Sequence, residues 1–496
     1  MSETLASDGD VTAVKIGADP RRWWALTVIS LATVMVVLDA TIVNVALPQA
    51  QAALHISDAN RQWIVTAYTL PFGGLLLLGG RIADFGGRRR AFLIGLVGFA
   101  LASGLGGAAN TQGLLFTARA LQGVFAALLA PAALSLLNVT FTDKRERATA
   151  FGVYGAVLGG GSALGLLAGG LLTNYLDWRW CLYVNIAIAA VAFVGAIPLI
   201  AESRTDGETK YDIPGAVLVT AGLGLLVYGF AKAVDDGWGS ATTLGLLIGG
   251  ALLVVVFVAV QARTRNPLLP LRIAVDRNRG GAYLASLLVF LAMMGMFFFL
   301  TYYLQGVRGY SALKTGMAIL PLTLVVIVGS GIVTGLMRVV PPRIIISASF
   351  LLCAVALVWF SRIGLHSSYA GQLLGPEIVV GIGMAGVLVP VTNLALLGIG
   401  GQDSGVASGL VSASQQVGGS IGTALLNTIA ATTTTHYLTH HHSSNAALDM
   451  AKGAIHGYSV GFLVAAAVFA LGAVASLWLI NATKSETAGA GMAAAS

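Results

Sequence analysis

Three ionisable residues lie inside long apolar stretches of the chain, and their chemistry is the most informative feature of the sequence. Asp39 and Glu377 are carboxylic acids, and Arg119 is a permanent cation. A charge at the centre of a bilayer costs at least about 2.5 kcal/mol unless it is paired or neutralised, so such residues usually mark ion or proton pathways. We therefore expect Asp39, Arg119 and Glu377 to couple proton movement to function, with no covalent catalysis.

Asp39 and Arg119 are expected at similar depths in the membrane. Asp39 lies about sixteen residues into the first apolar stretch, roughly 24 Å along an α-helix, and Arg119 lies about six residues from the outer end of the fourth stretch. An ion pair between them that breaks when the acid is protonated would couple proton movement to substrate movement. A purely structural ion pair is the alternative interpretation. Glu377 follows Gly375 and Pro376, so it could instead mark a helix start near the membrane surface.

Apolar stretches long enough to cross a bilayer recur about fourteen times along the chain. A bilayer core about 30 Å thick is spanned by roughly 20 helical residues, and unpaired backbone groups are too costly in hydrocarbon, so each stretch predicts a transmembrane helix. The composition of 56% hydrophobic and 10% charged residues leaves too little polar surface for a soluble protein of 496 residues. The predicted spans are 23–47, 61–80, 91–108, 113–137, 149–172, 180–200, 213–231, 241–261, 281–305, 315–337, 342–360, 371–397, 404–430 and 457–480.

The distribution of basic residues predicts the orientation. Most of the 28 Lys and Arg residues lie in the tails and in alternate loops, which places both termini in the cytoplasm of a multi-pass plasma membrane protein. The Gly- and Ala-rich composition favours a bacterial source. The net charge of +7 is explained by this topology, so no nucleic-acid partner is expected.

Several classes of site are not predicted. No lysine follows a glycine, so the chain has no Walker A loop for ATP, and we expect a proton gradient as the energy source and no cofactor. Cys181 and Cys353 lie in apolar spans, where a disulfide or metal site is not expected. The histidines after the thirteenth span are interpreted as a solvated loop and not as a metal site; they are His436, His440, His441 and His442.

Sequence motifs resemble those of one transporter family. The segment Leu38-Asp39-Ala40-Thr41-Ile42-Val43-Asn44-Val45-Ala46-Leu47-Pro48 closely resembles the first-helix motif of the fourteen-span drug:proton antiporters of the major facilitator superfamily. The segment 80–90 resembles the cytoplasmic gating motif of that superfamily, with Phe85 where a basic residue is usual. Arg119, Gln122 and Gly123 match its fourth-helix motif. The gating residues implied by the resemblance are Gly80, Asp84, Gly87 and Arg88.

The resemblance implies an all-α polytopic fold of two six-helix bundles that face a central cavity, with spans seven and eight inserted between them. The expected organisation is a cytoplasmic tail 1–22, an N-terminal bundle 23–200, a linker with the inserted pair 201–265, a C-terminal bundle 266–481 and a cytoplasmic tail 482–496.

Glycines at every fourth position form a smooth ridge on the fifth span, and we expect Gly161, Gly165 and Gly169 to let another helix approach closely. Leu166 stands where the antiporter motif usually has proline. The thirteenth span repeats this glycine spacing, as an internal repeat of six helices requires.

Residues that line the substrate cavity are harder to assign. On an ideal helix Asp39 points roughly 140° away from Thr41 and Asn44, so these side chains cannot all face one cavity. We assign Asp39 to proton chemistry and the other two to packing or polar lining. The ninth span is rich in Met, Phe and Tyr, which suits varied lipophilic ligands. The expected substrate-binding residues are Asn44, Gln122, Phe297, Tyr303, Asn393 and Gln415.

These observations together predict a proton-driven exporter of lipophilic, often cationic compounds that works by alternating access as a monomer. A carboxylate that accepts either a proton or a cationic substrate would give exchange. A dedicated exporter of one metabolite, such as an antibiotic, a lipid or a siderophore, is the alternative. A non-transporting membrane scaffold is a third hypothesis, and a membrane-bound enzyme is the least supported.

Overall fold

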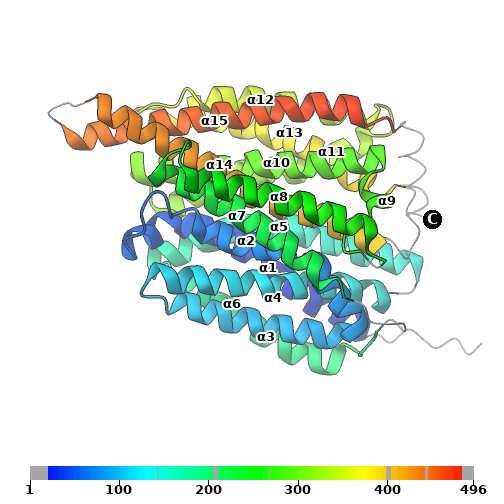
Figure 1. Cartoon of the computed structure of the whole chain (residues 1–496). Coiled ribbons are helices and arrows are strands. Elements are labelled where there is room, and N and C mark those ends of the chain that lie inside the picture. The colour runs from blue at the N-terminus through cyan, green and yellow to red at the C-terminus, as the bar shows by residue number, and fades with distance from the viewer. Residues whose placement is uncertain are drawn as a thin grey trace, which may run out of the picture.

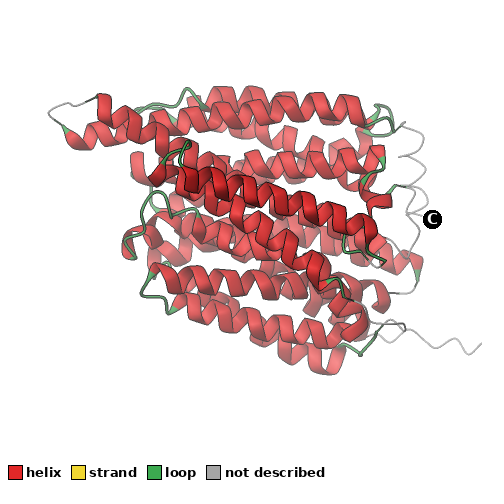
Figure 2. Cartoon of the chain, viewed as in Figure 1, coloured by secondary structure: helices red, strands yellow, loops and turns green. Residues whose placement is uncertain are grey.

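The computed structural model describes residues 21–141, 143–204, 211–265, 267–397, 404–441 and 445–482, and within them the chain is helical with no strand (Figure 2). The long helices are α1 (Arg21–Ala53), α2 (Trp63–Gly86), α3 (Arg88–Gly107), α4 (Gln112–Thr140), α5 (Lys144–Tyr175), α6 (Trp180–Leu199), α7 (Ile213–Asp236), α8 (Ala241–Arg263), α10 (Arg277–Tyr302), α11 (Ala312–Leu336), α12 (Pro342–Phe360), α13 (Leu374–Leu396), α14 (Ser404–His440) and α15 (Ala446–Leu479). The helix α9 (Leu271–Ala274) is a single turn, and π-helical turns at Tyr303–Val307 and Tyr369–Leu373 adjoin α10 and α13.

Twelve helices in the described residues are long and apolar enough to cross a membrane. Each predicted span overlaps one long helix, but α5 and α14 are not among the twelve. The multi-pass membrane character of the chain is therefore confirmed, and the count of fourteen crossings stays a prediction.

The outer surface of the helices is apolar, as a lipid-facing surface must be. Leu101 and Val194 are 69% and 68% exposed, an exposure that a water-soluble surface does not repeat over many large apolar residues. Exposed aromatic residues gather at the two ends of the helices, with Trp478 near one end and Tyr175 and Trp180 near the other. Such aromatic belts lie at the two membrane–water interfaces.

The helices pack as two groups joined along two seams. Helices α1–α6 contact one another, as do α10–α15, while α5 packs against α11 and α2 packs against α14 across the boundary (Figure 1). We call these groups the N-terminal and C-terminal bundles. We call the end where α1 begins and α15 ends the inner end, and the opposite end the outer end.

The inserted helices α7 and α8 pack against each other, and α7 also covers the seam between α2 and α14. Thr428 of α14 donates a hydrogen bond to the carbonyl oxygen of Phe230 at 2.7 Å. On the other side, Gly74 of α2 lies so close to Thr220 that an added Cβ would collide with it. The inserted pair therefore contacts both bundles at once.

The hairpin of α14 and α15 extends past the neighbouring helices at the outer end (Figure 1). The interpretation of the histidine segment as a loop was wrong for His436 and His440, because α14 continues to His440. The hydroxyl of Thr435 donates to the carbonyl oxygen of Ala431, and the ring of Tyr437 packs against that of His456 of α15 with centroids 5.4 Å apart. Contacts within the hairpin therefore stabilise this last part of α14. His442 lies outside the described residues.

The glycine ridge of α5 faces α1. Added Cβ atoms on Gly161 and Gly169 would lie 3.1 Å from Val37 and 2.9 Å from the carbonyl oxygen of Ile42. A Cβ on Gly165 would overlap the hydroxyl oxygen of Thr41. The absence of side chains on α5 therefore sets its distance from α1, which is the helix that carries Asp39.

We expect Gly165→Ala to lower the stability of the protein by about 1–3 kcal/mol, because the new methyl group must push α5 away from α1. The matched control is Gly160→Ala on the same helix, where an added Cβ meets nothing within 4 Å. Thermal unfolding of both variants in detergent checks this. If the Gly165→Ala protein unfolds at the same temperature as the Gly160→Ala protein, the tight contact between α5 and α1 is contradicted.

Candidate functional site

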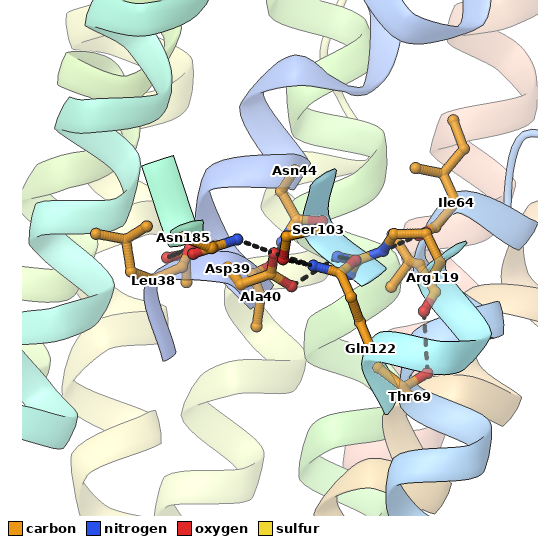
Figure 3. Close-up of polar contacts among 12 residues, drawn as sticks. Leu38, Asp39, Ala40, Asn44, Ile64, Thr69, Ser103, Arg119, Gln122 and Asn185 are labelled. Carbon is orange, nitrogen blue, oxygen red and sulfur yellow. Dashed lines mark hydrogen bonds and ion pairs between the residues drawn. The ribbon is translucent and has the colours of Figure 1, made fainter. Parts of the chain in front are cut away.

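Asp39 lies at the centre of a buried polar network inside the N-terminal bundle (Figure 3). Arg119 of α4 donates to Asp39 Oδ2 at 2.6 Å. Gln122 of α4 and Asn185 of α6 donate to Asp39 Oδ1 at 3.0 and 2.8 Å. Both Asp39 oxygens thus accept hydrogen bonds, and the charge partner is a guanidinium, which is the environment of an ionised carboxylate.

Arg119 is held on every side. Its Nε donates to the carbonyl oxygen of Ile64 at 3.0 Å, its Nη1 also donates to Gln122 Oε1 at 2.9 Å, and its guanidinium lies 4.5 Å from the ring centroid of Tyr68. Arg119 is 1% exposed and Asp39 is not exposed at all. A pair so fully removed from water contributes only if its remaining hydrogen bonds are made. Ile64 and Gln122 accept two of them, and the ring of Tyr68 adds a cation–π contact.

The contacts of Asp39 define what its protonation would change. If Asp39 takes one up, its charge disappears and its bond to Arg119 weakens, while Arg119 keeps its bonds to Ile64 and Gln122. The helix α1 then loses its strongest link to α4. The same helix packs on the glycine ridge of α5, and α5 contacts α11 at the seam between the bundles.

Two predicted substrate-binding residues are buried and hydrogen-bonded within the N-terminal bundle. Gln122 is buried and also donates to Ser103 Oγ at 2.7 Å, so it belongs to the Asp39 network. Asn44 donates to the carbonyl oxygen of Ala40 one turn earlier in its own helix, at 3.2 Å. The sequence reasoning did not assign Asn185 or Ser103 to the network, although a polar residue inside an apolar span was the available signal.

The other predicted lining residues have varied surroundings. Tyr303 is buried and its hydroxyl donates to the carbonyl oxygen of Gly364 at 2.7 Å. Phe297 and Gln415 are half-buried, and Asn393 is exposed with its amide bonded to the Val389 carbonyl. Phe297 and Gln415 are therefore partly accessible, whereas Tyr303 is not.

Glu377 is a second buried acid, at the start of α13 in the C-terminal bundle. It is fully buried, and its Oε1 has no hydrogen-bond partner among the described residues. Its Oε2 lies 3.2 Å from the hydroxyl of Tyr369, and that hydroxyl lies 2.7 Å from the carbonyl oxygen of Ala318. The Tyr369 hydroxyl therefore has one proton to share between the carbonyl oxygen of Ala318 and Glu377 Oε2.

The predicted gating residues lie at the inner end of α2 and α3. Asp84 pairs with Arg88 at 3.0 Å and accepts a bond from Ser135 of α4 at 3.2 Å. The amides that begin α3 are capped by Glu202, not by Asp84. Gly87 has a φ of 112°, which favours glycine, and an added Cβ on Gly80 would lie 3.5 Å from Pro131.

Two polar contacts between the bundles lie at the outer end. Gln305, just after α10, donates to the carbonyl oxygen of Val45 in α1 at 2.8 Å. Arg61, in the turn before α2, donates to Asn427 Oδ1 of α14 at 3.0 Å. The two bundles are therefore joined at the outer end in this conformation. The sequence reasoning gave Arg61 no role.

Comparison with known proteins identifies the family. The model of the Major Facilitator Superfamily matches residues 29–423. The chain is 47% identical to "Puromycin resistance protein pur8" of Streptomyces alboniger, over 98% of this chain and 97% of that one. It is 40% identical to "Cephamycin export protein CmcT" of Amycolatopsis lactamdurans, over 84% and 87% of the two chains.

A multidrug resistance protein and a solved structure extend the comparison. The chain is 33% identical to "Multidrug resistance protein Stp" of Mycobacterium tuberculosis, over 83% and 76% of the two chains. The solved bacterial homologue of the human lysosomal transporter Spinster has a TM-score of 0.63 at 16% identity, covering 94% of this chain and all of that one. The sequence match, the relatives and the shared fold agree, and the chain belongs to the major facilitator superfamily of membrane transporters and is not an enzyme.

Proposed function

We propose that this protein is an efflux transporter that exports small molecules, including lipophilic and cationic compounds, in exchange for protons. The buried Asp39–Arg119 pair carries the proposal, because a fully desolvated carboxylate with a breakable charge partner is a proton site inside a membrane protein. The relatives named for puromycin resistance, cephamycin export and multidrug resistance support export as the direction of transport.

The geometry favours indirect coupling between proton and substrate. Asp39 is enclosed by its own bundle, so in this conformation a substrate between the bundles does not reach it. The direct competition at one carboxylate that the sequence suggested is therefore replaced by a relay. Protonation of Asp39 releases Arg119, α1 shifts against α5, and the seam between α5 and α11 rearranges.

Glu377 is the proposed second proton carrier. It sits in the other bundle and makes its only described hydrogen bond with a phenol, so an exchange of its proton changes the packing of α13 against α11. The substrate is proposed to lie between the bundles, with Phe297 and Gln415 among its contacts. Asp84 and Arg88 are proposed to act at the inner gate.

The proposed setting is the plasma membrane of a bacterium, with both termini in the cytoplasm and the inner end facing it. Fourteen crossings, the domain boundaries expected from the sequence, function as a monomer and the absence of a cofactor belong to the same proposal. Export of a single antibiotic is the second candidate, and the 47% identity to a puromycin resistance protein favours it.

Proton flux in proteoliposomes tests the proposal. We expect ethidium or puromycin, added to purified protein under an imposed pH gradient, to increase proton movement across the membrane. Flux with puromycin and not with ethidium assigns the narrow exporter. No flux with ethidium, puromycin or a cephamycin rejects proton-coupled export of these drugs and favours a dedicated exporter of another metabolite, or the scaffold.

A further inference from the structure

An aromatic cage at the outer end of the C-terminal bundle holds a cation that belongs to the other bundle. The cage consists of the rings of Phe298 and Tyr302 of α10 and the amide of Asn427 of α14, all buried. The buried Tyr458 of α15 lies beside it, with its ring stacked on Phe299. The guanidinium carbon of Arg61 lies 4.3 Å from the ring centroid of Tyr302 and 5.2 Å from that of Phe298. Its Nε donates to Asn427 Oδ1 at 3.0 Å.

Arg61 enters this cage from the N-terminal bundle. It belongs to the turn between α1 and α2, and its Nη1 pairs with Asp58 of the same turn at 3.2 Å. The amide of Asn427 also donates to the carbonyl oxygen of Asp58, at 3.1 Å. Arg61 and Asp58 therefore belong to the N-terminal bundle, whereas the two rings and Asn427 belong to the C-terminal bundle.

The cage has the chemistry of a binding site for organic cations. Ring faces attract a cation by their quadrupoles, most strongly where water is excluded. Asn427 adds one carbonyl oxygen as an acceptor. The bound group here is planar, delocalised and weakly hydrated, so a lipophilic cation with spread charge matches the cage better than a compact ammonium ion or an anion does.

Release of a substrate to the outside requires the bundles to part at the outer end, and that movement takes Arg61 out of the cage. We propose that the emptied cage is an exit subsite for cationic substrates, and that Arg61 is a tethered competitor that displaces them when the outer end closes again. This inference rests on the proposed function, because it assigns a subsite on the exit path of an exporter. The return of Arg61 to the cage would also explain why an exported cation is not carried back when the outer end closes.

Binding of tetraphenylphosphonium to the full chain in lipid nanodiscs, without a gradient, tests the cage. We expect Arg61→Gln to bind this cation at least about tenfold more tightly than wild type does, because the competitor is gone. Arg61→Gln combined with Tyr302→Leu should lose that gain. Tyr302→Leu alone should bind as wild type does, since Arg61 still fills the site.

Arg179→Gln is the matched control. Arg179 also lies over a ring, 4.5 Å from the centroid of Trp178, but within the N-terminal bundle. Its removal lowers the net charge equally and should leave the affinity for tetraphenylphosphonium unchanged. Thermal unfolding checks that each variant is folded, and Arg61→Met, which fills the space without charge, replaces Arg61→Gln if that protein is not monodisperse.

Three results overturn the inference: an unchanged or weaker affinity in both Arg61 variants, a gain that survives Tyr302→Leu, or an equal gain in Arg179→Gln. Transport is measured separately with wild type, so the two ideas fail independently. Wild type that exports no cation, together with a cage-dependent gain in Arg61→Gln, rejects cation export and the exit role but keeps the cage as a cation-binding site. Wild type that exports cations without that gain rejects the subsite alone.

Discussion

We expect Asp39→Asn to abolish proton-coupled export, with a loss of at least about 100-fold in the rate driven by a pH gradient. Asparagine has nearly the shape of aspartate but neither binds a proton nor carries the charge that Arg119 requires. If Asp39 is the proton carrier, the variant is fixed in the equivalent of its protonated state. The cycle then has no step that a proton gradient can drive.

The Asp39→Asn protein should still fold, because the network can accommodate an amide. The oxygen of the introduced amide can accept from Arg119, and its NH₂ group needs an acceptor. Asn185 can supply one, since its Oδ1 is buried without a hydrogen-bond partner in the described residues. Rotation of its side-chain amide by half a turn would direct that oxygen toward the introduced NH₂ group. Arg119 keeps its bonds to Ile64 and Gln122.

The measurement is ethidium or puromycin efflux from proteoliposomes under an imposed pH gradient, with thermal unfolding of the same preparation. Asp236→Asn is the control, because Asp236 is exposed and pairs with Lys232 on its own helix at 3.9 Å. It should transport as wild type does. A folded Asp39→Asn protein that retains gradient-driven efflux removes Asp39 from the coupling and leaves Glu377→Gln as the next variant to test.

The sequence was sufficient to locate charged residues inside the membrane, where an unpaired charge is energetically unfavourable. Asp39 and Arg119 were expected to pair because both lie in apolar stretches at similar depth, and the structure joins them at 2.6 Å. The transporter fold was likewise predictable, since long apolar repeats leave few alternatives and the first-helix motif resembles one family. The free-energy cost of a buried charge and the repetition of apolar stretches can both be recognised from residue types and their spacing alone.

Which way each side chain faces was not predictable. Gln122 was predicted to bind substrate, but its side chain bonds to Asp39, because the rotation of α4 is fixed by packing against α2 and α3 and not by its own sequence. The contact between the bundles that Arg61 makes was not predictable either. Its partner, Asn427, lies 366 residues later in the chain. Contacts between bundles also depend on the conformational state, which spacing along a chain does not encode.

We expect Arg119→Leu to lower the stability by about 3–5 kcal/mol, because it leaves the Asp39 carboxylate buried without a charge partner. The double variant Asp39→Asn/Arg119→Leu should regain most of that loss, since no uncompensated charge remains in the bundle. Both proteins should fail in coupled transport, so stability alone distinguishes them. Unfolding in mixed micelles of wild type, the two single variants and the double variant gives the coupling energy of the pair. A coupling energy near zero would mean that the pair does not hold α1 to α4, and protonation of Asp39 would then have no structural consequence to transmit.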